Sequence, residues 1–389
     1  MTVITLASRD LMRALDTIAP ALDDRLPILG AARLTREGDH LCISGTDMDM
    51  QIDATAPAEL NGADVAALLA RPMAIRRAVR CAGSKTVALV PGEKLGIAAG
   101  DLRLSLYATP ASDWPAMEAA PKVLFEATLT PAALAALRRV SPAISDDLAR
   151  YYLNGVHIHR GAEPETYTAV ATDGHRLYSA GFSAPEVAGS LPDNVIIPSA
   201  AVRALLSIAG REPVRLRLSP RSNASEGSPP LAIFECRGAR LTAKLIDGKF
   251  PDYRAAIPQE TPDTARVSRA NLRRAVATLL AAGNGCYPGI KLTLANGKLT
   301  LEHPSLRMEG GPNEIILPYR GSLSGPYTIG LNGRYLAGLL DFFGSSPRVT
   351  LAMKCAGEMH KAPILVTSPN DGAAQAVVMP LRDAEWRPA

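Results

Sequence analysis

The chain has 389 residues, of which 47% are hydrophobic and 21% charged, the composition of a globular protein with room for two or three domains. A net charge of only +4 does not by itself indicate a nucleic-acid binder, and no apolar run reaches the roughly 18 residues that span a membrane. Five scattered cysteines without a CxxC pair argue against a disulfide framework or a zinc site. Because Arg9, Asp10 and Arg13 come too early for a signal peptide, we expect a cytoplasmic, nucleoid-associated protein.

One pattern occurs three times along the chain: a short alternating strand, a serine or threonine, and then an amphipathic helix. The copies are 4–11, 127–134 and 265–272. Ser8, Thr130 and Ser268 stand where a helix N-cap is expected, and Pro131 fills a first helical position. The leucines that end the copies lie 123 and 138 residues apart, the spacing of whole domains.

A second helix is expected in each copy, at 71–80, 198–206 and 332–340, with alternating strands such as 241–246 and 291–295 between the helices. Two helices against antiparallel strands define an α+β unit. The sequence therefore predicts three tandem copies of one α+β domain. Their expected ranges are 1–122, 123–262 and 263–389.

Charge is distributed unevenly between the expected helices and the rest of the chain. The helical segments 8–20, 71–81, 130–141, 198–211, 268–282 and 332–343 hold fourteen arginines and three acids. Their net charge is +11, so the remainder carries −7. Basic helices on an acidic body suit a protein that follows DNA phosphates without reading bases, and no base-reading motif accompanies them. The alternative is that arginine simply favours solvated helix faces. The helix arginines expected to contact duplex DNA are Arg76, Arg80, Arg138, Arg203 and Arg273.

Two strings, ATDGHRL at 171–177 and LIDGKFPDY at 245–253, together resemble the bacterial DNA polymerase III beta subunit, the sliding clamp family. Supporting matches stand in the same order at 25–29, 45–50, 150–155 and 377–382. The resemblance implies a head-to-tail homodimeric ring of six similar domains, with helices lining the hole and sheets outside. It implies a processivity factor without catalytic chemistry, cofactor or metal.

The resemblance also implies three kinds of contact residue. Short linear motifs of the polymerase III alpha subunit, the clamp loader, other DNA polymerases and repair proteins would enter a hydrophobic cleft. Its implied residues are Leu153, Thr172, Gly174, His175, Arg176, Leu177, Pro251, Asn332, Tyr335, Val377, Met379, Pro380, Leu381 and Arg382. Implied DNA contacts are Arg25, Arg150, Tyr151 and Tyr152. The implied dimer contacts are Leu104, Leu106, Ala281 and Ala282.

The sequence departs from the family at several of these places. Ala281 and Ala282 replace bulkier apolar residues at the joint, and a tail of residues 383–389 follows the family's usual end. Asp147 adds a negative charge beside the tyrosines expected to face DNA. These departures favour one alternative function, a peptide-binding scaffold that does not encircle DNA.

Three further patterns have a functional and a structural interpretation. His157 and His159 share one face of a strand, which is compatible with a metal pair but lacks further ligands. Asp173 and His175 resemble an acid–base pair of a hydrolase, but a tight turn with a structural aspartate is favoured because no nucleophile motif accompanies them. The glycine-rich stretch 281–289 lacks the ending of a phosphate loop and is predicted to be a plain loop.

Overall fold

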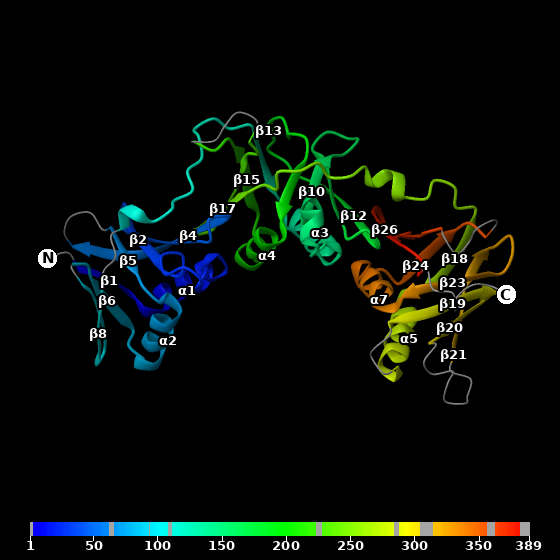
Figure 1. Ribbon diagram of the computed structural model, residues 1–389, viewed down its shortest axis with the longest axis horizontal. Coiled ribbons are helices and arrows are strands. Elements are labelled where there is room, and N and C mark those ends of the chain that lie inside the picture. Colours follow the sequence, from blue (N-terminus) through cyan, green and yellow to red (C-terminus); the bar gives the residue numbers. More distant parts are fainter. Residues whose placement is uncertain are drawn as a thin grey trace. The chain divides into compact units, whose positions relative to one another are not determined.

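The computed structural model describes residues 3–61, 66–92, 94–107, 111–222, 228–283, 288–303, 314–355 and 362–381. Its secondary structure is α+β, as predicted (Figure 1). Contacts divide the chain into two compact units: unit 1 is Met1–Leu134 with Ala184–Asp247, and unit 2 is Ala135–Ser183 with Gly248–Ala389. The boundaries of the three expected domains stay a prediction.

Unit 1 contains one large antiparallel sheet. Its strands run in the order β13-β9-β15-β16-β17-β4-β1-β6-β7-β8, and β4 also carries β3, then β2, then β5. The strand bounds are β1 Val3–Ala7, β2 Ala32–Glu37, β3 His40–Thr46, β4 Met50–Asn61, β5 Ala66–Leu69, β6 Thr86–Val90, β7 Lys94–Ala99, β8 Leu102–Tyr107, β9 Phe125–Leu129, β13 Ala188–Gly189, β14 Val195–Pro198, β15 Val214–Ser219, β16 Leu231–Cys236 and β17 Ala239–Lys244.

Unit 2 contains two antiparallel sheets. One follows the path β10-β11-β12-β26-β25-β24-β18-β22, and the other the path β21-β20-β19-β23. The strand bounds are β10 Gly155–Arg160, β11 Thr166–Thr172, β12 Arg176–Ser183, β18 Asp263–Ser268, β19 Gly289–Ala295, β20 Lys298–Glu302, β21 Glu314–Pro318, β22 Arg320–Ser322, β23 Tyr327–Asn332, β24 Arg348–Met353, β25 Ile364–Ser368 and β26 Asp371–Val378.

The predicted helices are all present. They are α1 Ser8–Ile18, α2 Pro72–Ala82, α3 Pro131–Val140, α4 Ser199–Ile208, α5 Arg269–Ala282 and α7 Gly333–Phe342. Thr130 and Ser268 cap their helices as predicted, since their hydroxyl oxygens accept from Ala133 N (3.2 Å) and Asn271 N (3.4 Å).

The prediction for Ser8 was wrong. Ala7 occupies the cap position of α1, and Ser8 is the first helical residue. The backbone N–H of Ser8 donates to Lys85 O, and its buried hydroxyl has no hydrogen-bond partner among the described residues. Strand β1 therefore runs into the helix without a side-chain cap.

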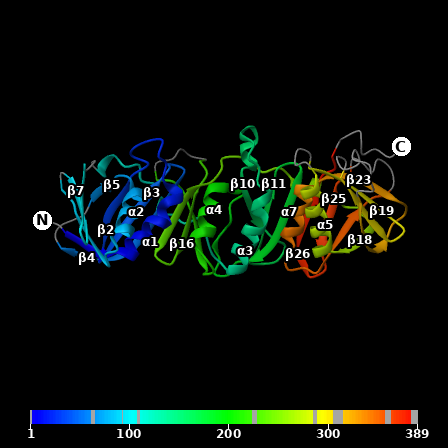
Figure 2. The ribbon, with the colours of Figure 1, turned by 90° about the horizontal axis from the view of Figure 1, so that it is seen from below.

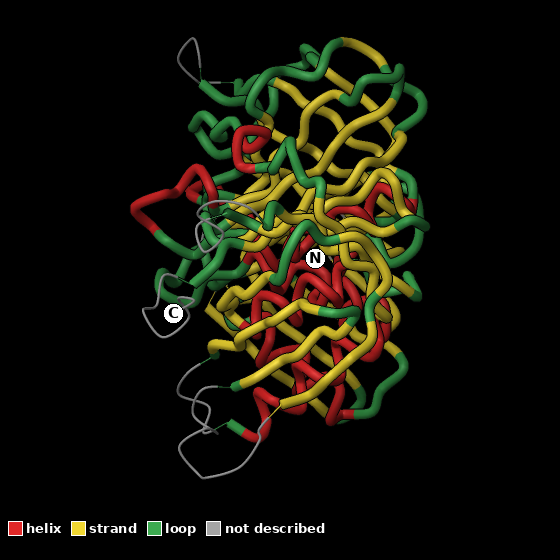
Figure 3. Tube along the Cα trace, turned by 90° about the vertical axis from the view of Figure 1, so that its right-hand side faces the viewer, coloured by secondary structure: helices red, strands yellow, loops and turns green. Residues whose placement is uncertain are grey.

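Each helix buries an apolar stripe against strands (Figure 3). In α1 the predicted stripe of Leu11, Leu15 and Ile18 is fully buried, and the helix packs on β3 and β4 beside α2. Burying three such side chains contributes roughly 1.5–3 kcal/mol each. In unit 2, α5 and α7 lie side by side (Figure 2). Within the described ranges, no helix has the length and apolar character needed to cross a membrane.

One turn is built identically in both units, after β3 in unit 1 and after β11 in unit 2. In each, the hydroxyl of a threonine, Thr46 or Thr172, donates to the backbone carbonyl four residues on, at 2.9 and 2.7 Å. The following aspartate, Asp47 or Asp173, accepts from the backbone amides two and three residues on. Such a shared network of local hydrogen bonds is the structural counterpart of the repeat found in the sequence.

Candidate functional site

The apolar part of the predicted peptide site lies where β12 meets β26. Leu177 and Val377 are paired across this ladder and are 3% and 2% exposed. Met379 follows β26 and is half-buried, and its backbone N–H donates to His175 O at 2.8 Å. The ladder thus brings together residues about 200 positions apart in the chain. Leu177 and Val377 form a buried base, whereas Met379 is accessible to a ligand.

The N-terminal end of α7 adds an aromatic residue to this group. Asn332 caps the helix by accepting from the backbone N–H groups of Arg334 (2.9 Å) and Tyr335 (3.3 Å). The Tyr335 ring then stacks on His175, with ring centres 6.1 Å apart. Partial burial raises the pKa of the Tyr335 hydroxyl, so it stays protonated at neutral pH.

The chain after β26 is fastened to β23. Pro380 forms an isolated bridge with Leu331, and the backbone N–H of Leu381 donates to Gly330 O at 2.8 Å. Together with the turn after β11, these contacts gather most of the predicted site. The gathered residues are Thr172, Gly174, His175, Arg176, Leu177, Asn332, Tyr335, Val377, Met379, Pro380 and Leu381.

Three predicted residues are not joined to this group. Leu153 is buried at the end of the 3-10 helix η4 (Leu148–Leu153). Pro251 is exposed, and no hydrogen bond or bridge between described residues connects it to the others. Arg382 lies outside the described residues.

Sequence reasoning did not single out Tyr178. This tyrosine is fully buried and its hydroxyl reaches Tyr335 O at 3.5 Å; burial raises its pKa to about 12. It follows Leu177 on β12 but is buried on the other face, so strand alternation gives no signal for it.

Asp173 is a structural turn residue, as favoured from the sequence. One carboxylate oxygen accepts from the backbone amides of His175 and Arg176, and the other pairs with the Arg176 side chain at 3.0 Å. Both oxygens therefore hold the turn and the arginine, and neither orients the His175 ring as an acid–base partner would.

His157 and His159 also have structural partners. Their ring centres are 5.5 Å apart; His157 stacks on Phe250 at 4.7 Å, and His159 Nε2 lies 2.8 Å from the Tyr253 hydroxyl. Burial lowers the pKa of His159. The described residues contain no cluster of three or more metal-binding side chains. These two histidines pack the segment that enters the last third of the chain.

The basic helices are less available to DNA than their charge count suggests, because each of their three acids pairs with an arginine. Asp16 of α1 binds Arg76 of α2 (2.6 Å), and Asp341 of α7 binds Arg273 of α5 through two hydrogen bonds (2.9 and 3.0 Å). The third acid, Asp10, pairs with its neighbour Arg9 at 3.5 Å. Of the predicted DNA contacts, Arg76 and Arg273 are therefore tied to other helices, whereas Arg80, Arg138 and Arg203 have exposed side chains.

The remaining predicted DNA contacts lie outside the α-helices. Arg25 is exposed and makes a bidentate pair with Asp23, which lowers the pKa of that carboxyl. Arg150 in η4 pairs with Asp147 at 2.9 Å and packs against Gly174, where a Cβ would come within 2.6 Å of its guanidinium. The adjacent Tyr151 is 52% exposed, and Tyr152 packs edge-on against it.

The predicted dimer contacts lie at element ends or edges. Leu104 and Leu106 are half-buried on β8, the terminal strand of the unit 1 path. Ala281 and Ala282 are exposed at the end of α5. An edge strand with unpaired backbone groups is the element that another chain can extend.

A repeated α+β architecture, exposed helix arginines and an apolar site with few polar groups together define the class of DNA clamps. Comparison with known proteins agrees. The model of the DNA polymerase III beta subunit N-terminal domain matches residues 2–118, and that of its central domain matches residues 129–252.

Similarity extends along nearly the whole chain. The beta sliding clamp of Caulobacter vibrioides is 32% identical, covering 97% of this chain and 99% of the relative. The crystal structure of the Caulobacter crescentus clamp superposes with a TM-score of 0.86 at 28% identity, covering 98% of this chain and 99% of that one. The Helicobacter pylori beta clamp, solved with a DNA ligase peptide, has a TM-score of 0.82 at 18% identity over 97% of this chain and 99% of that one, which shows the fold alone. The chain belongs to the beta sliding clamp family, the beta subunits of DNA polymerase III. Its function is that of a sliding clamp, a non-catalytic processivity factor.

Proposed function

We propose that two copies of this chain close a head-to-tail ring around duplex DNA in the cytoplasm. The observation that supports this most directly is the repeat: the same strand–helix pattern begins at β1, β9 and β18, and the same turn recurs in both units. Three similar domains per chain, at 1–122, 123–262 and 263–389, would give six in the ring. The exposed arginines Arg80, Arg138 and Arg203 then contact phosphates weakly and without regard to sequence, so the ring slides.

The test of the ring is topological. The protein, loaded with its clamp loader and ATP, is expected to stay on nicked circular DNA and to be lost after the circle is cut. Equal retention on circular and linear DNA would contradict encirclement.

The peptide site of unit 2 is proposed to hold the polymerase III alpha subunit, the clamp loader and other partners one at a time. Support comes from its composition: Leu177, Val377 and Met379 form an apolar surface, while His175 and Arg176 offer polar groups that orient a ligand. The peptide bound to the Helicobacter pylori clamp is a precedent for this type of ligand.

Peptide binding tests the placement of this site. A labelled peptide rich in Gln, Leu and Phe should bind, and Met379→Ala together with Leu177→Ala should weaken it by about tenfold or more. Ile316→Ala is the matched control, since Ile316 is an exposed apolar residue on β21. Because Leu177 is buried, the unfolding temperature of each variant is measured first. Unchanged affinity in a folded double variant would refute this placement.

A peptide-binding scaffold that does not encircle DNA is the second candidate. It is favoured by the small, exposed Ala281 and Ala282 at the predicted joint, which offer little apolar area. Sedimentation at micromolar concentration separates the two: a stable monomer supports the scaffold, and a dimer supports the ring.

A further inference from the structure

Unit 1 contains a counterpart of the site that unit 2 builds after its repeated turn. There the backbone N–H of Lys244 donates to Asp49 O at 2.9 Å, as that of Met379 donates to His175 O at 2.8 Å. Strand β4 pairs with β17 next to this bond, as β12 pairs with β26 in unit 2. Lys244 therefore occupies in unit 1 the position that Met379 occupies in unit 2.

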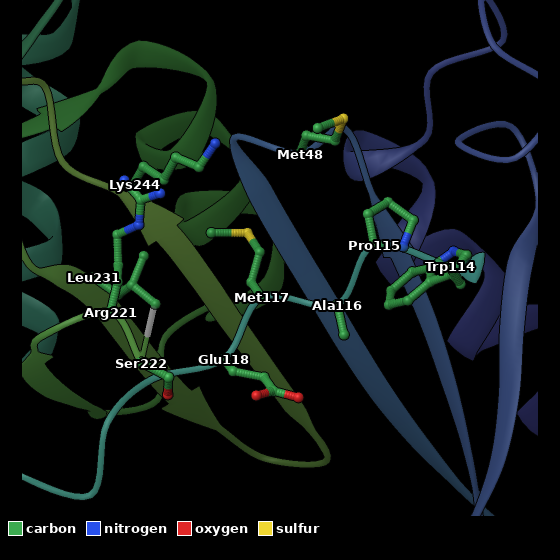
Figure 4. A pocket seen from close by; sticks show the side chains of 10 residues that line it. All are labelled: Met48, Trp114, Pro115, Ala116, Met117, Glu118, Arg221, Ser222, Leu231 and Lys244. Carbon is green, nitrogen blue, oxygen red and sulfur yellow. The ribbon is translucent and has the colours of Figure 1, made fainter. Parts of the chain in front are cut away.

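A cavity of about 410 Å³ opens beside this counterpart (Figure 4). Met117 lies between the side formed by Arg221 and Lys244 and the side formed by Trp114 and Pro115. Met48, at the tip of the turn, is 48% exposed. This volume falls in the range of ligand pockets, and methionines adapt their shape to different apolar groups.

The wall of the cavity is fixed by backbone hydrogen bonds. Met117 N donates to the side-chain oxygen of Gln51 at 2.8 Å. Ala119 forms a bridge with Arg221, and Ser222 N donates to Glu118 O at 3.1 Å. The segment that crosses the cavity is therefore ordered before any ligand arrives, which reduces the entropic cost of binding.

The unit 1 cavity is more polar than the unit 2 site and carries positive charge. Gln51 pairs with Thr242 across the ladder, where unit 2 pairs Leu177 with Val377. Arg221 is exposed and forms no ion pair with any residue that the structure describes. Lys244 is 34% exposed, with Asp49 at 3.2 Å. Cations beside methionine and tryptophan side chains suit a ligand with an apolar anchor next to carboxylates.

We propose that this cavity is a second docking site, for a short extended peptide in which an apolar side chain is flanked by Asp or Glu. The apolar anchor packs between Met48, Met117 and Trp114, and the carboxylates pair with Arg221 and Lys244. The proposal goes beyond the function given above, because it assigns unit 1 its own class of partner. It requires neither ring closure nor an intact unit 2 site.

The experiment uses the full chain and a labelled acidic peptide with a central Leu-Phe pair between Asp and Glu residues. Binding is followed by fluorescence anisotropy at low and at moderate salt. Arg221→Glu should weaken binding by about tenfold or more, because it removes one charge-assisted contact and adds repulsion. Arg237→Glu is the matched control, since Arg237 is exposed at the opposite end of the β16–β17 hairpin.

A second variant and two competitors distinguish the outcomes. Met48→Asp should also abolish binding, and the same peptide with Lys in place of its acids should not bind. An excess of the Gln-, Leu- and Phe-rich peptide should leave the acidic peptide bound, and Met379→Ala should have no effect on it. Displacement by that peptide, displacement by duplex DNA, or unchanged affinity in both Arg221→Glu and Met48→Asp would each overturn the proposal.

Discussion

The guanidinium of Arg176 lies over the ring of Tyr335, 4.7 Å from its centre. Asp173 holds the arginine from the other side, and only 17% of the Arg176 side chain is exposed. This stack joins β12 to α7 and fixes one wall of the proposed peptide site.

Removing the Tyr335 ring should therefore weaken peptide binding. A partly desolvated cation–π contact contributes about 1 kcal/mol, so Tyr335→Ala is expected to lower affinity by about fivefold or more. Tyr335→Phe keeps the ring and should bind within about twofold of the parent chain. Titration with the Gln-, Leu- and Phe-rich peptide checks both; equal affinities of the Ala and Phe variants would show that the ring contributes nothing.

Asp147 should restrain DNA binding by Arg150. Its carboxylate accepts from the arginine at 2.9 Å, and this hydrogen bond lowers the pKa of Asp147, so the pair is charged at neutral pH. Asp147→Asn should release the arginine for a phosphate, raise affinity for duplex DNA at low salt, and steepen the salt dependence by about 0.9 in log–log slope. Asp146→Asn, which changes a neighbouring exposed acid, is the control. Equal effects of the two variants would indicate a change in net charge alone.

The exposed and paired helix arginines should behave differently. Arg80→Ala and Arg203→Ala are each expected to reduce the salt slope of DNA binding by about 0.9 with little change in stability. Arg76→Ala should mainly lower the unfolding temperature, because this side chain is 17% exposed and connects α2 to Asp16 of α1. DNA titrations at several salt concentrations and thermal melts of each variant make the comparison. The prediction fails if Arg76→Ala alters DNA binding as much as Arg80→Ala.

His159 should make stability depend on pH below about 6.5. Its Nδ1 lies 2.7 Å from Arg160 O and its Nε2 lies 2.8 Å from the Tyr253 hydroxyl, an arrangement that suits the neutral ring. Burial lowers the pKa of His159 in the folded state, so the unfolded chain takes up the proton first as pH falls. Stability is therefore fully present above the unfolded pKa and is lost as pH falls towards the folded one.

Thermal melts between pH 8 and pH 5 test this dependence. His159→Gln keeps a hydrogen-bonding side chain without a titrating ring, so the difference between parent and variant isolates the contribution of His159. That difference should shrink as the pH falls below about 6.5. A difference that is constant across the range would show that His159 does not titrate differently on folding.

Much of the fold followed from local sequence patterns. The helices fell where apolar spacing and capping residues predicted them, because these signals act within one or two turns of the chain. The turn at Asp173 was predictable for the same reason, since its hydrogen bonds span only two or three residues. Ser8 was the exception: its surroundings are set by Lys85, which comes from a distant strand.

The sequence by itself determined the repeat, the secondary structure, the excess of arginine on the helices and, through its motifs, the family. Only the tertiary structure decided which of those arginines remain available, because Asp341 reaches Arg273 from 68 residues away. It also decided that Lys244 stands where Met379 stands in unit 2, which made the second cavity visible. Both relationships depend on contacts between distant segments, and such contacts are fixed by how sheets and helices pack rather than by any local pattern.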